Sequence, residues 1–411
     1  MINYIDLFAG AGGLSEGFTA TGFLPIAHVE MNKEACNTLR TRACYYYLKS
    51  VDKLKIYKKY LTGKITRDDL YSTVPDDILN TIINFTMSES SMPKLFSIID
   101  NLLKKQEKKQ VDLLVGGPPC QAYSLVGRAV KGSDMANDSR NYLYKLYIKV
   151  LRKYRPKMFV FENVPGLLTA SKGKYLYDME RAFKRAGYQI QYKILNAEDF
   201  GVLQKRHRVI IIGWPNDSSY YYPEFKKVKN RFHVSDLFFD LPAIQAGSKA
   251  SSYRVGRFSN YLSETGIRKP SDILTWHVAR PIISRDRVIY QQVIKAWEEN
   301  GKRLKYTDLP LDLCTHKNRK AFLDRFKVVA DNLPASHTMM AHISKDGHYF
   351  IHPDINQARS ITVREAARIQ SFPDDYFFEG ARTSAFTQIG NAVPPLMAKG
   401  IAFELKKQLE E

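Results

Sequence analysis

Short apolar runs alternate with helical patterns along the first half of the chain. The runs expected to form buried strands are residues 4–8, 24–29, 111–115, 157–161 and 209–212. Helical periodicity begins near residue 14 and returns at 175–187, 363–372 and 396–409. Strands separated by helices are typical of a parallel sheet with helices on both faces. We therefore predict an α/β fold with a doubly wound, mostly parallel, Rossmann-like sheet.

Two segments interrupt this alternation. Residues 41–110 are rich in Lys and Tyr and helical in pattern, so we interpret them as a helical insertion. Residues 216–355 carry scattered basic and aromatic side chains without a repeat, which predicts a second, smaller domain. The expected organisation is a first domain from residues 1–215 plus 356–411, interrupted by the second domain at 216–355.

The excess of basic residues favours a polyanionic partner. The 411 residues include 62 Lys and Arg against 42 Asp and Glu, a formal net charge of +20. Lysines and arginines that neutralise phosphates supply most non-specific affinity for nucleic acid, so this is the leading partner class. A genome that favours lysine codons is an alternative source of part of the excess.

The four cysteines limit the compartment and the metal chemistry. They form no CxxC pair, so a zinc site built on them is not expected. Few cysteines in a long chain suit a reducing cytoplasm. No signal peptide or membrane-spanning run is evident, and we expect a cytoplasmic protein without a membrane partner.

A glycine-rich loop follows the first predicted strand. Gly10, Gly12 and Gly13 separate that strand from the next helix, and Glu30 ends the second strand. Glycines let a ligand approach the backbone at a helix N-terminus, and a carboxylate at the next strand end can bind ribose hydroxyls. Because the spacing is not GxGxxG, a tight turn without a ligand stays an equal alternative.

Cys120 is the candidate nucleophile. It directly follows Gly-Gly-Pro-Pro on a loop that leaves a buried strand, and the prolines restrict the backbone that carries the sulfur. The thiolate is the reactive form of such a side chain. A lone cysteine is more often a small core residue, but the loop setting favours a chemical role.

Three further polar residues adjoin strand-like runs. Glu162 ends the run 157–161, where a carboxylate could hold and donate a proton or only cap the next loop. Arg206 and Arg208 share one face of a strand because side chains alternate, so they could enter one pocket or form a solvated edge. A nucleotide-like cofactor, a thiol, an acid and two guanidiniums together suggest group transfer to an electrophilic ring.

The ordered motifs resemble the DNA (cytosine-5) methyltransferase family of bacterial restriction–modification systems. The motifs that carry the resemblance are DLFAGAGGLSEGF at 6–18, GGPPCQAYS at 116–124, FENVPGLL at 161–168, QKRHRVIIIG at 204–213, TVREAARIQSFPDDY at 362–376 and QIGNAVPP at 388–395. The resemblance covers roughly residues 1–40, 110–215 and 355–411. In this family the variable segment between the motifs is the target recognition domain, which here corresponds to residues 216–355.

The resemblance implies S-adenosylmethionine as methyl donor and no metal. Phe8 is expected to stack on the adenine, Glu30 to bind the ribose, and Asn391 to close the pocket. The full set of implied cofactor residues is Phe8, Ala9, Gly10, Gly12, Gly13, Leu14, Glu30, Met31, Asp100, Pro119 and Asn391. The surroundings of Asp100 match the family only loosely.

The resemblance also implies the catalytic roles. Cys120 is expected to attack C6 of cytosine, Glu162 to contact N3 and the exocyclic amine, Arg208 to contact O2, and Arg206 to support the site. Because the reacting atoms lie inside the duplex, the base must be flipped out. A basic loop is expected to close over it, with DNA contacts from Gln121, Ser124, Arg128 and Arg140.

The implied partners are double-stranded DNA and a paired restriction endonuclease, with the protein acting as a cytoplasmic, nucleoid-associated monomer. Three alternatives stay open. The RNA branch of the family methylates tRNA, a catalytically silent relative would only bind DNA, and a small-molecule methyltransferase could use the same sheet. The long basic and aromatic segment at 216–355 favours a DNA-reading domain over the RNA branch.

Overall fold

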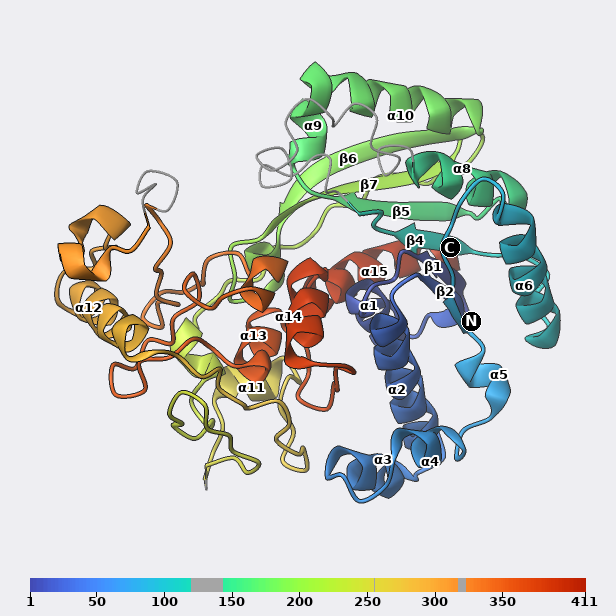
Figure 1. Ribbon diagram of the computed structural model, residues 1–411. Coiled ribbons are helices and arrows are strands. Elements are labelled where there is room, and N and C mark those ends of the chain that lie inside the picture. The colour runs from blue at the N-terminus through green and yellow to red at the C-terminus, as the bar shows by residue number, and fades with distance from the viewer. Residues whose placement is uncertain (120–142, 255, 317–322) are drawn as a thin grey trace.

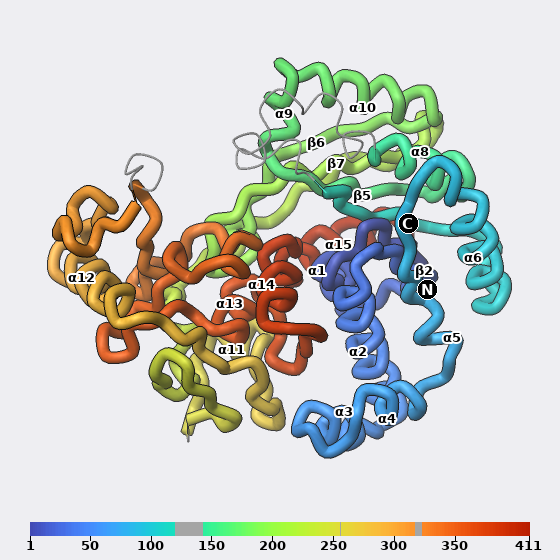
Figure 2. Tube along the Cα trace, viewed as in Figure 1, coloured from blue at the N-terminus to red at the C-terminus, as the bar shows by residue number. Residues whose placement is uncertain are grey.

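The computed structural model describes residues 1–119, 143–254, 256–316 and 323–411. Figures 1 and 2 show a sheet with helices on both faces and a second lobe that contains α11 to α14. Five of the predicted site residues, namely Cys120, Gln121, Ser124, Arg128 and Arg140, lie outside the described residues.

The described strands form a seven-stranded sheet in the order β3-β2-β1-β4-β5-β7-β6. The first five strands along this order are parallel, whereas β7 is antiparallel to both β5 and β6. The strands are β1 (Asn3–Leu7), β2 (Leu24–Glu30), β3 (Ile82–Asn84), β4 (Leu113–Gly116), β5 (Met158–Asn163), β6 (Tyr188–Asn196) and β7 (His207–Pro215). The predicted α/β class with a mostly parallel sheet is confirmed.

Helices of the described chain cover the sheet and build the second lobe. They are α1 (Gly13–Ala20), α2 (Lys33–Ser50), α3 (Leu54–Leu61), α4 (Arg67–Tyr71), α5 (Asp76–Leu79), α6 (Met92–Lys105), α8 (Leu143–Tyr154), α9 (Gly166–Thr169), α10 (Lys174–Arg185), α11 (Asn260–Glu264), α12 (Ser284–Asn300), α13 (Val363–Ile369), α14 (Arg382–Asn391) and α15 (Pro395–Glu410). Short 3-10 turns are η3 (Ala170–Gly173), η4 (Ala197–Phe200), η5 (Val234–Leu237), η6 (Tyr306–Asp308), η7 (Leu311–Leu313) and η8 (Ala341–Ser344).

Each face of the sheet has its own apolar core. On one face, side chains of β1, β4, β5 and β7 pack against α6, α8 and α10. On the other face, the alternate residues of the same strands pack against α1 and α15. Because the central strands are buried on both faces, they read as continuous apolar runs in the sequence.

The segment 41–110 is not a wholly helical insertion, which corrects the sequence-based interpretation. Helix α2 already begins at Lys33, and the segment contains β3, which pairs in parallel with β2 at the edge of the sheet. Helix α6 then returns across the face, with Leu95 and Ile99 buried. Only α3 to α5 therefore stand outside the alternation of strands and helices.

The second lobe is joined to the C-terminal segment by packing. One core cluster contains Leu237 and Leu262 from the predicted second domain together with Ile369 and Phe386 of α13 and α14. A buried ionic network reinforces this contact, since Arg368 pairs with Asp240 at 2.7 Å. The packing therefore continues across residue 355. The domain boundaries expected from the sequence stay a prediction.

Candidate active site

The carboxyl ends of the parallel strands bring the predicted site residues to one edge. Leu7 at the end of β1 pairs with Val29 on one side and with Gly116 on the other. Gly116 in turn pairs with Phe161, which directly precedes Glu162 in β5. Ligands of open α/β sheets bind at this edge, outside the strand ends.

The loop after β1 is shaped for close approach of a ligand. Phe8, Gly10 and Gly12 all have positive φ, at 58°, 54° and 78°. A non-glycine residue such as Phe8 in this region is strained, and strain of this kind gathers at ligand sites. A Cβ on Gly10 would meet nothing within 4 Å, so the loop borders open space at this position. Ala9 and Leu14 are buried, and Leu14 packs into the core between α1 and α15.

Glu30 is held in place by two backbone groups. Its carboxylate accepts a hydrogen bond from the Gly10 amide at 2.9 Å and another from the Asn32 amide at 2.7 Å. Each oxygen keeps a second lone pair that can accept from a ligand hydroxyl. The neighbouring Met31 is 64% exposed and offers an apolar surface at the same strand end. This cradle suits the ribose and base of a nucleoside cofactor.

The C-terminal segment closes against the glycine loop. A Cβ on Gly13 would lie 2.2 Å from the Val393 carbonyl oxygen, so the two backbones are in direct contact. The Tyr376 hydroxyl donates to the Ala11 carbonyl. Asn391 ends α14 two residues before Val393 and is exposed. The structure therefore brings the segment that carries Asn391 to the expected cofactor loop.

Asp6 lies buried beneath this loop. It accepts a hydrogen bond from the Ser15 hydroxyl at 2.5 Å, while its other carboxylate oxygen has no hydrogen-bond partner among the described residues. Burial, with the Glu30 charge as a smaller contribution, raises the pKa of Asp6 to about 7. The sequence alone does not identify this residue as part of a site, because a buried carboxylate inside a strand has no characteristic spacing.

Glu162 and Arg208 form an ion pair where β5 and β7 meet. The Arg208 Nε and Glu162 Oε1 atoms are 2.6 Å apart, and the two side chains are only 11% and 12% exposed. A Cβ on Gly117 would lie 2.5 Å from Glu162 Oε2, so the Gly-Gly-Pro-Pro backbone is in contact with this carboxylate. Pro119, the last described residue of that loop, directly precedes Cys120. The structure thus joins three of the predicted motifs at one point.

Arg206 does not enter this pocket, although the sequence placed it on the same face as Arg208. Its buried guanidinium donates to the carbonyls of Met339, Gly390 and Ala392 at 2.6, 2.9 and 2.8 Å. The Gly390 and Ala392 carbonyls belong to the segment that closes the glycine loop, whereas Met339 lies in the second lobe. Arg206 therefore holds the second lobe and the C-terminal segment against β7, which is a supporting role.

The structure does not place Asp100 at the carboxyl edge of the sheet, so its predicted contact with adenine is wrong. It lies within α6, is exposed, and pairs with Lys153 of α8 at 3.0 Å. The polar residue that ends β3 is Asn84, whose side-chain amide donates to the carbonyls of Glu30 and Met31 at 3.1 and 2.9 Å. The sequence signal for Asn84 was only two β-branched residues before an amide, which is too short to identify a strand.

Within the described part of the chain, no three or more His, Cys, Asp or Glu side chains gather where they could hold a metal ion. No described helix is long and apolar enough to cross a membrane.

The sequence pattern of the C-5 cytosine-specific DNA methylases matches residues 2–75 and 90–407. The chain belongs to this family. It is a DNA cytosine-5 methyltransferase, and enzymes of the family use S-adenosylmethionine.

Curated relatives agree over the whole length. Type II methyltransferase M.Bpa9945I of Bacillus paralicheniformis is 43% identical, with 98% of each chain covered. Type II methyltransferase M1.HphI of Haemophilus parahaemolyticus is 31% identical, over 98% of this chain and 86% of its own. Among solved structures, a prophage-encoded E. coli protein described as a DNA modification methyltransferase is similar with a TM-score of 0.65 at 22% identity, covering both chains completely. This last likeness shows the shared fold.

Proposed function

We propose that this methyltransferase flips a cytosine out of double-stranded DNA and methylates it at C5 through a covalent bond between Cys120 and C6. The observation that carries the proposal is the Glu162–Arg208 pair, which touches the backbone of Gly117 three residues before Cys120. An acid, a guanidinium and the loop that leads to a thiol converge there, beside the open glycine loop. Such a cluster can bind the polar edge of a pyrimidine ring and orient it toward a nucleophile.

The open space at Gly10 and the Glu30 cradle fit a nucleoside cofactor. Gly10, Glu30, Met31 and Asn391 would hold S-adenosylmethionine, with Phe8, Ala9, Gly12, Gly13, Leu14 and Pro119 shaping the loops around it. When bound, S-adenosylmethionine supplies an electrophilic methyl group.

The protein's own groups make cytosine reactive. The Cys120 thiolate adds to C6 and forms a carbon–sulfur bond, while Glu162 holds a proton at N3 and Arg208 contacts O2. The C5=C6 electrons then become available at C5, which accepts the methyl group. Loss of the C5 proton to a base returns its electron pair to the ring, the carbon–sulfur bond breaks, and the thiolate leaves. Arg206 acts through the backbone that it holds and not on the ring.

The names of the relatives support a biological setting for this activity. Since the curated relatives are named type II methyltransferases, we propose a restriction–modification system with a paired endonuclease. Residues 216–355 would read a short DNA sequence, and Gln121, Ser124, Arg128 and Arg140 would contact the DNA around the flipped base. The protein would act as a monomer in the bacterial cytoplasm, at the nucleoid. The net charge of +20 supports binding to the phosphate backbone.

A fluorinated substrate tests the covalent step. Fluorine at C5 cannot leave as a cation, so the enzyme should stay attached to DNA in which 5-fluorocytosine replaces cytosine throughout. We expect a complex that survives denaturing electrophoresis, that forms with wild type and S-adenosylmethionine, and that is absent with Cys120→Ala. A complex that forms equally well with Cys120→Ala would refute the assignment of the nucleophile. If methyl groups from S-adenosylmethionine are transferred to tRNA and not to DNA, the result would favour the RNA branch of the family.

A further inference from the structure

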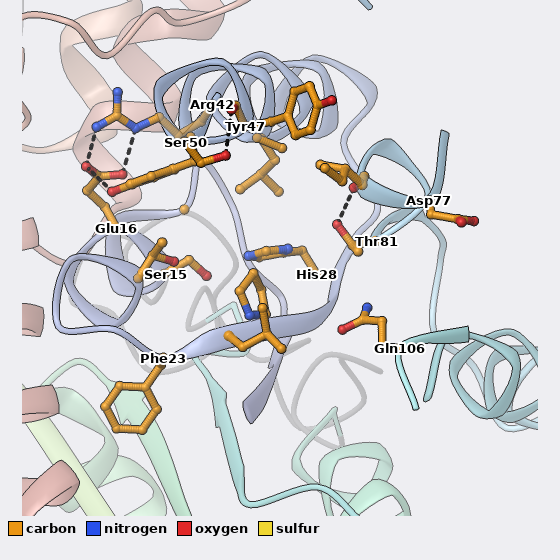
Figure 3. Close-up of a pocket in the computed structure, with 18 of the residues that line it drawn as sticks. Ser15, Glu16, Phe23, His28, Arg42, Tyr47, Ser50, Asp77, Thr81 and Gln106 are labelled. Atoms are coloured by element: carbon orange, nitrogen blue, oxygen red, sulfur yellow. Dashed lines mark hydrogen bonds and ion pairs between the residues drawn. The ribbon is translucent and has the colours of Figure 1, made fainter. Parts of the chain in front are cut away.

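A cavity of about 490 Å³ lies behind the glycine loop, between α1, α2, β2 and α5 (Figure 3). Most of its wall is apolar or aromatic, with contributions from Phe23, Leu24, Leu39, Tyr46, Tyr47 and Ile78. A volume of this size lies in the range that small-molecule sites occupy. The residues that line it come from these four elements and from the segments next to them, so the cavity is a feature of how the fold packs.

The cavity is distinct from the expected cofactor site. Of the residues assigned above to S-adenosylmethionine, only Gly12 lines it. Phe8, Glu30 and Met31 face the carboxyl edge of the sheet instead. A ligand in the cavity would therefore sit beside α1 and α2 without displacing the cofactor.

His28 places an unpaired polar group at the cavity wall. Its side chain lies on β2, is only 8% exposed, and lies in the cavity between β2 and α2 in Figure 3. Its buried Nδ1 atom has no hydrogen-bond partner in the described part of the chain. Burial lowers the pKa of His28 to about 4, so the ring is neutral. A buried polar group without a partner is costly, and a bound molecule can supply the missing hydrogen bond.

The charged side chains that line the cavity are paired, Asp77 with Lys105, and the Ser15 and Thr81 hydroxyls have partners within the protein. Arg42 pairs with Glu16 and, at 2.8 Å, with Asp375. The Ser15 hydroxyl donates to Asp6, and the Thr81 hydroxyl donates to the Ile78 carbonyl at 2.6 Å. The walls therefore offer no free charge, which disfavours an ionic ligand.

We propose that this cavity binds a neutral, mostly apolar organic molecule whose one hydrogen-bonding group meets the His28 ring. The aromatic walls supply most of the affinity by burial of apolar surface, and His28 selects for the polar group. This is a second small-molecule site, separate from the methyl donor.

Occupancy of the cavity should also be coupled to the cofactor, a consequence that rests on the proposed function. Gly12 and Tyr376 both line the cavity, and the Tyr376 hydroxyl holds the Ala11 carbonyl of the cofactor loop. A molecule that shifts either residue changes the loop that receives the cofactor. Thermodynamic reciprocity then requires that the cofactor change the affinity of the cavity ligand by the same factor.

Two isosteric probes test the site, p-cresol and p-xylene, which differ by a hydroxyl in place of a methyl group. Binding to the full-length protein is measured by ligand-observed NMR, which requires neither DNA nor methyl transfer. We expect saturable binding of both, with p-cresol roughly tenfold tighter because of its hydrogen bond, although p-xylene is the more hydrophobic molecule. Repeating the titration with S-adenosylhomocysteine should change both affinities together, and unchanged values would refute the coupling.

Two variants locate the binding. His28→Phe keeps an aromatic ring and removes the hydrogen bond, so the preference for p-cresol should disappear while p-xylene still binds. Ala43→Phe places a ring in the cavity from α2 and should abolish both. Absence of saturable binding to wild type, or p-cresol binding unchanged in both variants, would overturn the proposal. His28→Phe replaces one buried aromatic ring with another, so this variant tests the preference even if Ala43→Phe does not fold.

Discussion

Gly117→Ala tests whether contact between the Pro-Pro loop and Glu162 aligns the reacting groups. The new Cβ would lie 2.5 Å from Glu162 Oε2, about 0.9 Å inside ordinary van der Waals contact, which begins at 3.4 Å. Glu162 cannot simply swing away, because Arg208 holds its other oxygen at 2.6 Å. The loop that leads to Cys120 must therefore move by most of this distance. A misplacement of about 1 Å costs on the order of 100-fold in rate, which is our expectation for kcat.

The assay is single-turnover transfer of tritiated methyl to unmethylated duplex DNA, beside thermal unfolding of the same samples. Gly187→Ala is the matched control, since its φ is +90° and its Cβ would meet nothing within 4 Å. It lies between α10 and β6, so we expect a stability loss of about 1 kcal/mol from backbone strain and an unchanged rate. A folded Gly117→Ala enzyme that is as fast as wild type would show that contact between this loop and Glu162 does not align the reacting groups.

Three further predictions concern the supports of the site. Arg206→Met should lower the free energy of unfolding by about 3 kcal/mol in urea titrations, because three buried carbonyls lose their donor. Arg208→Met should mainly slow methyl transfer, roughly 100-fold. If both variants change stability and rate equally, the two arginines do not have separate roles. Tyr376→Phe should weaken S-adenosylmethionine binding roughly fivefold in calorimetry, since the glycine loop loses its hydroxyl donor; unchanged affinity would argue against this support. Folding raises the pKa of Asp6 from 3.8 to about 7, so the folded protein holds this proton more tightly than the unfolded chain does. The stability linked to the proton is fully present below pH 3.8 and is lost as pH rises through about 7. Asp6→Asn should therefore be more stable than wild type at pH 8 by up to about 4 kcal/mol, with the difference shrinking toward pH 4 in urea titrations; a constant difference would contradict the assignment.

Much of the sheet could be predicted because its central strands are buried on both faces. The runs at 4–8, 24–29 and 209–212 correspond to β1, β2 and β7 for this reason. Two strands were missed. β3 has three residues, and β6 is an edge strand with mostly exposed or half-buried side chains, so neither produces a strong apolar signal. The antiparallel direction of β7 depends on pairing with β5 and β6, which periodicity does not encode.

The candidate site was predictable where chemistry coincides with a strand end. Glu30, Glu162 and Arg208 belong to this class, and the structure brings the last two into contact. The partners of Arg206 were not predictable, because they are backbone carbonyls from segments more than a hundred residues away. The role predicted for Asp100 was wrong because the short strand β3 was not recognised. Without β3, the sequence does not show that Asp100 lies within the helix that follows it.

Methyl transfer to DNA from tritiated S-adenosylmethionine is the most direct test that this protein methylates cytosine and that Cys120 is the nucleophile. Wild type and Cys120→Ala are incubated with unmethylated bacteriophage DNA, and the product is mapped by bisulfite sequencing. We expect label at C5 of cytosine within one short sequence for wild type and none for the variant. A folded, cofactor-binding wild-type protein that transfers no methyl group to DNA would overturn the assignment of DNA as substrate, and a Cys120→Ala variant that transfers it normally would overturn the assignment of Cys120 as nucleophile.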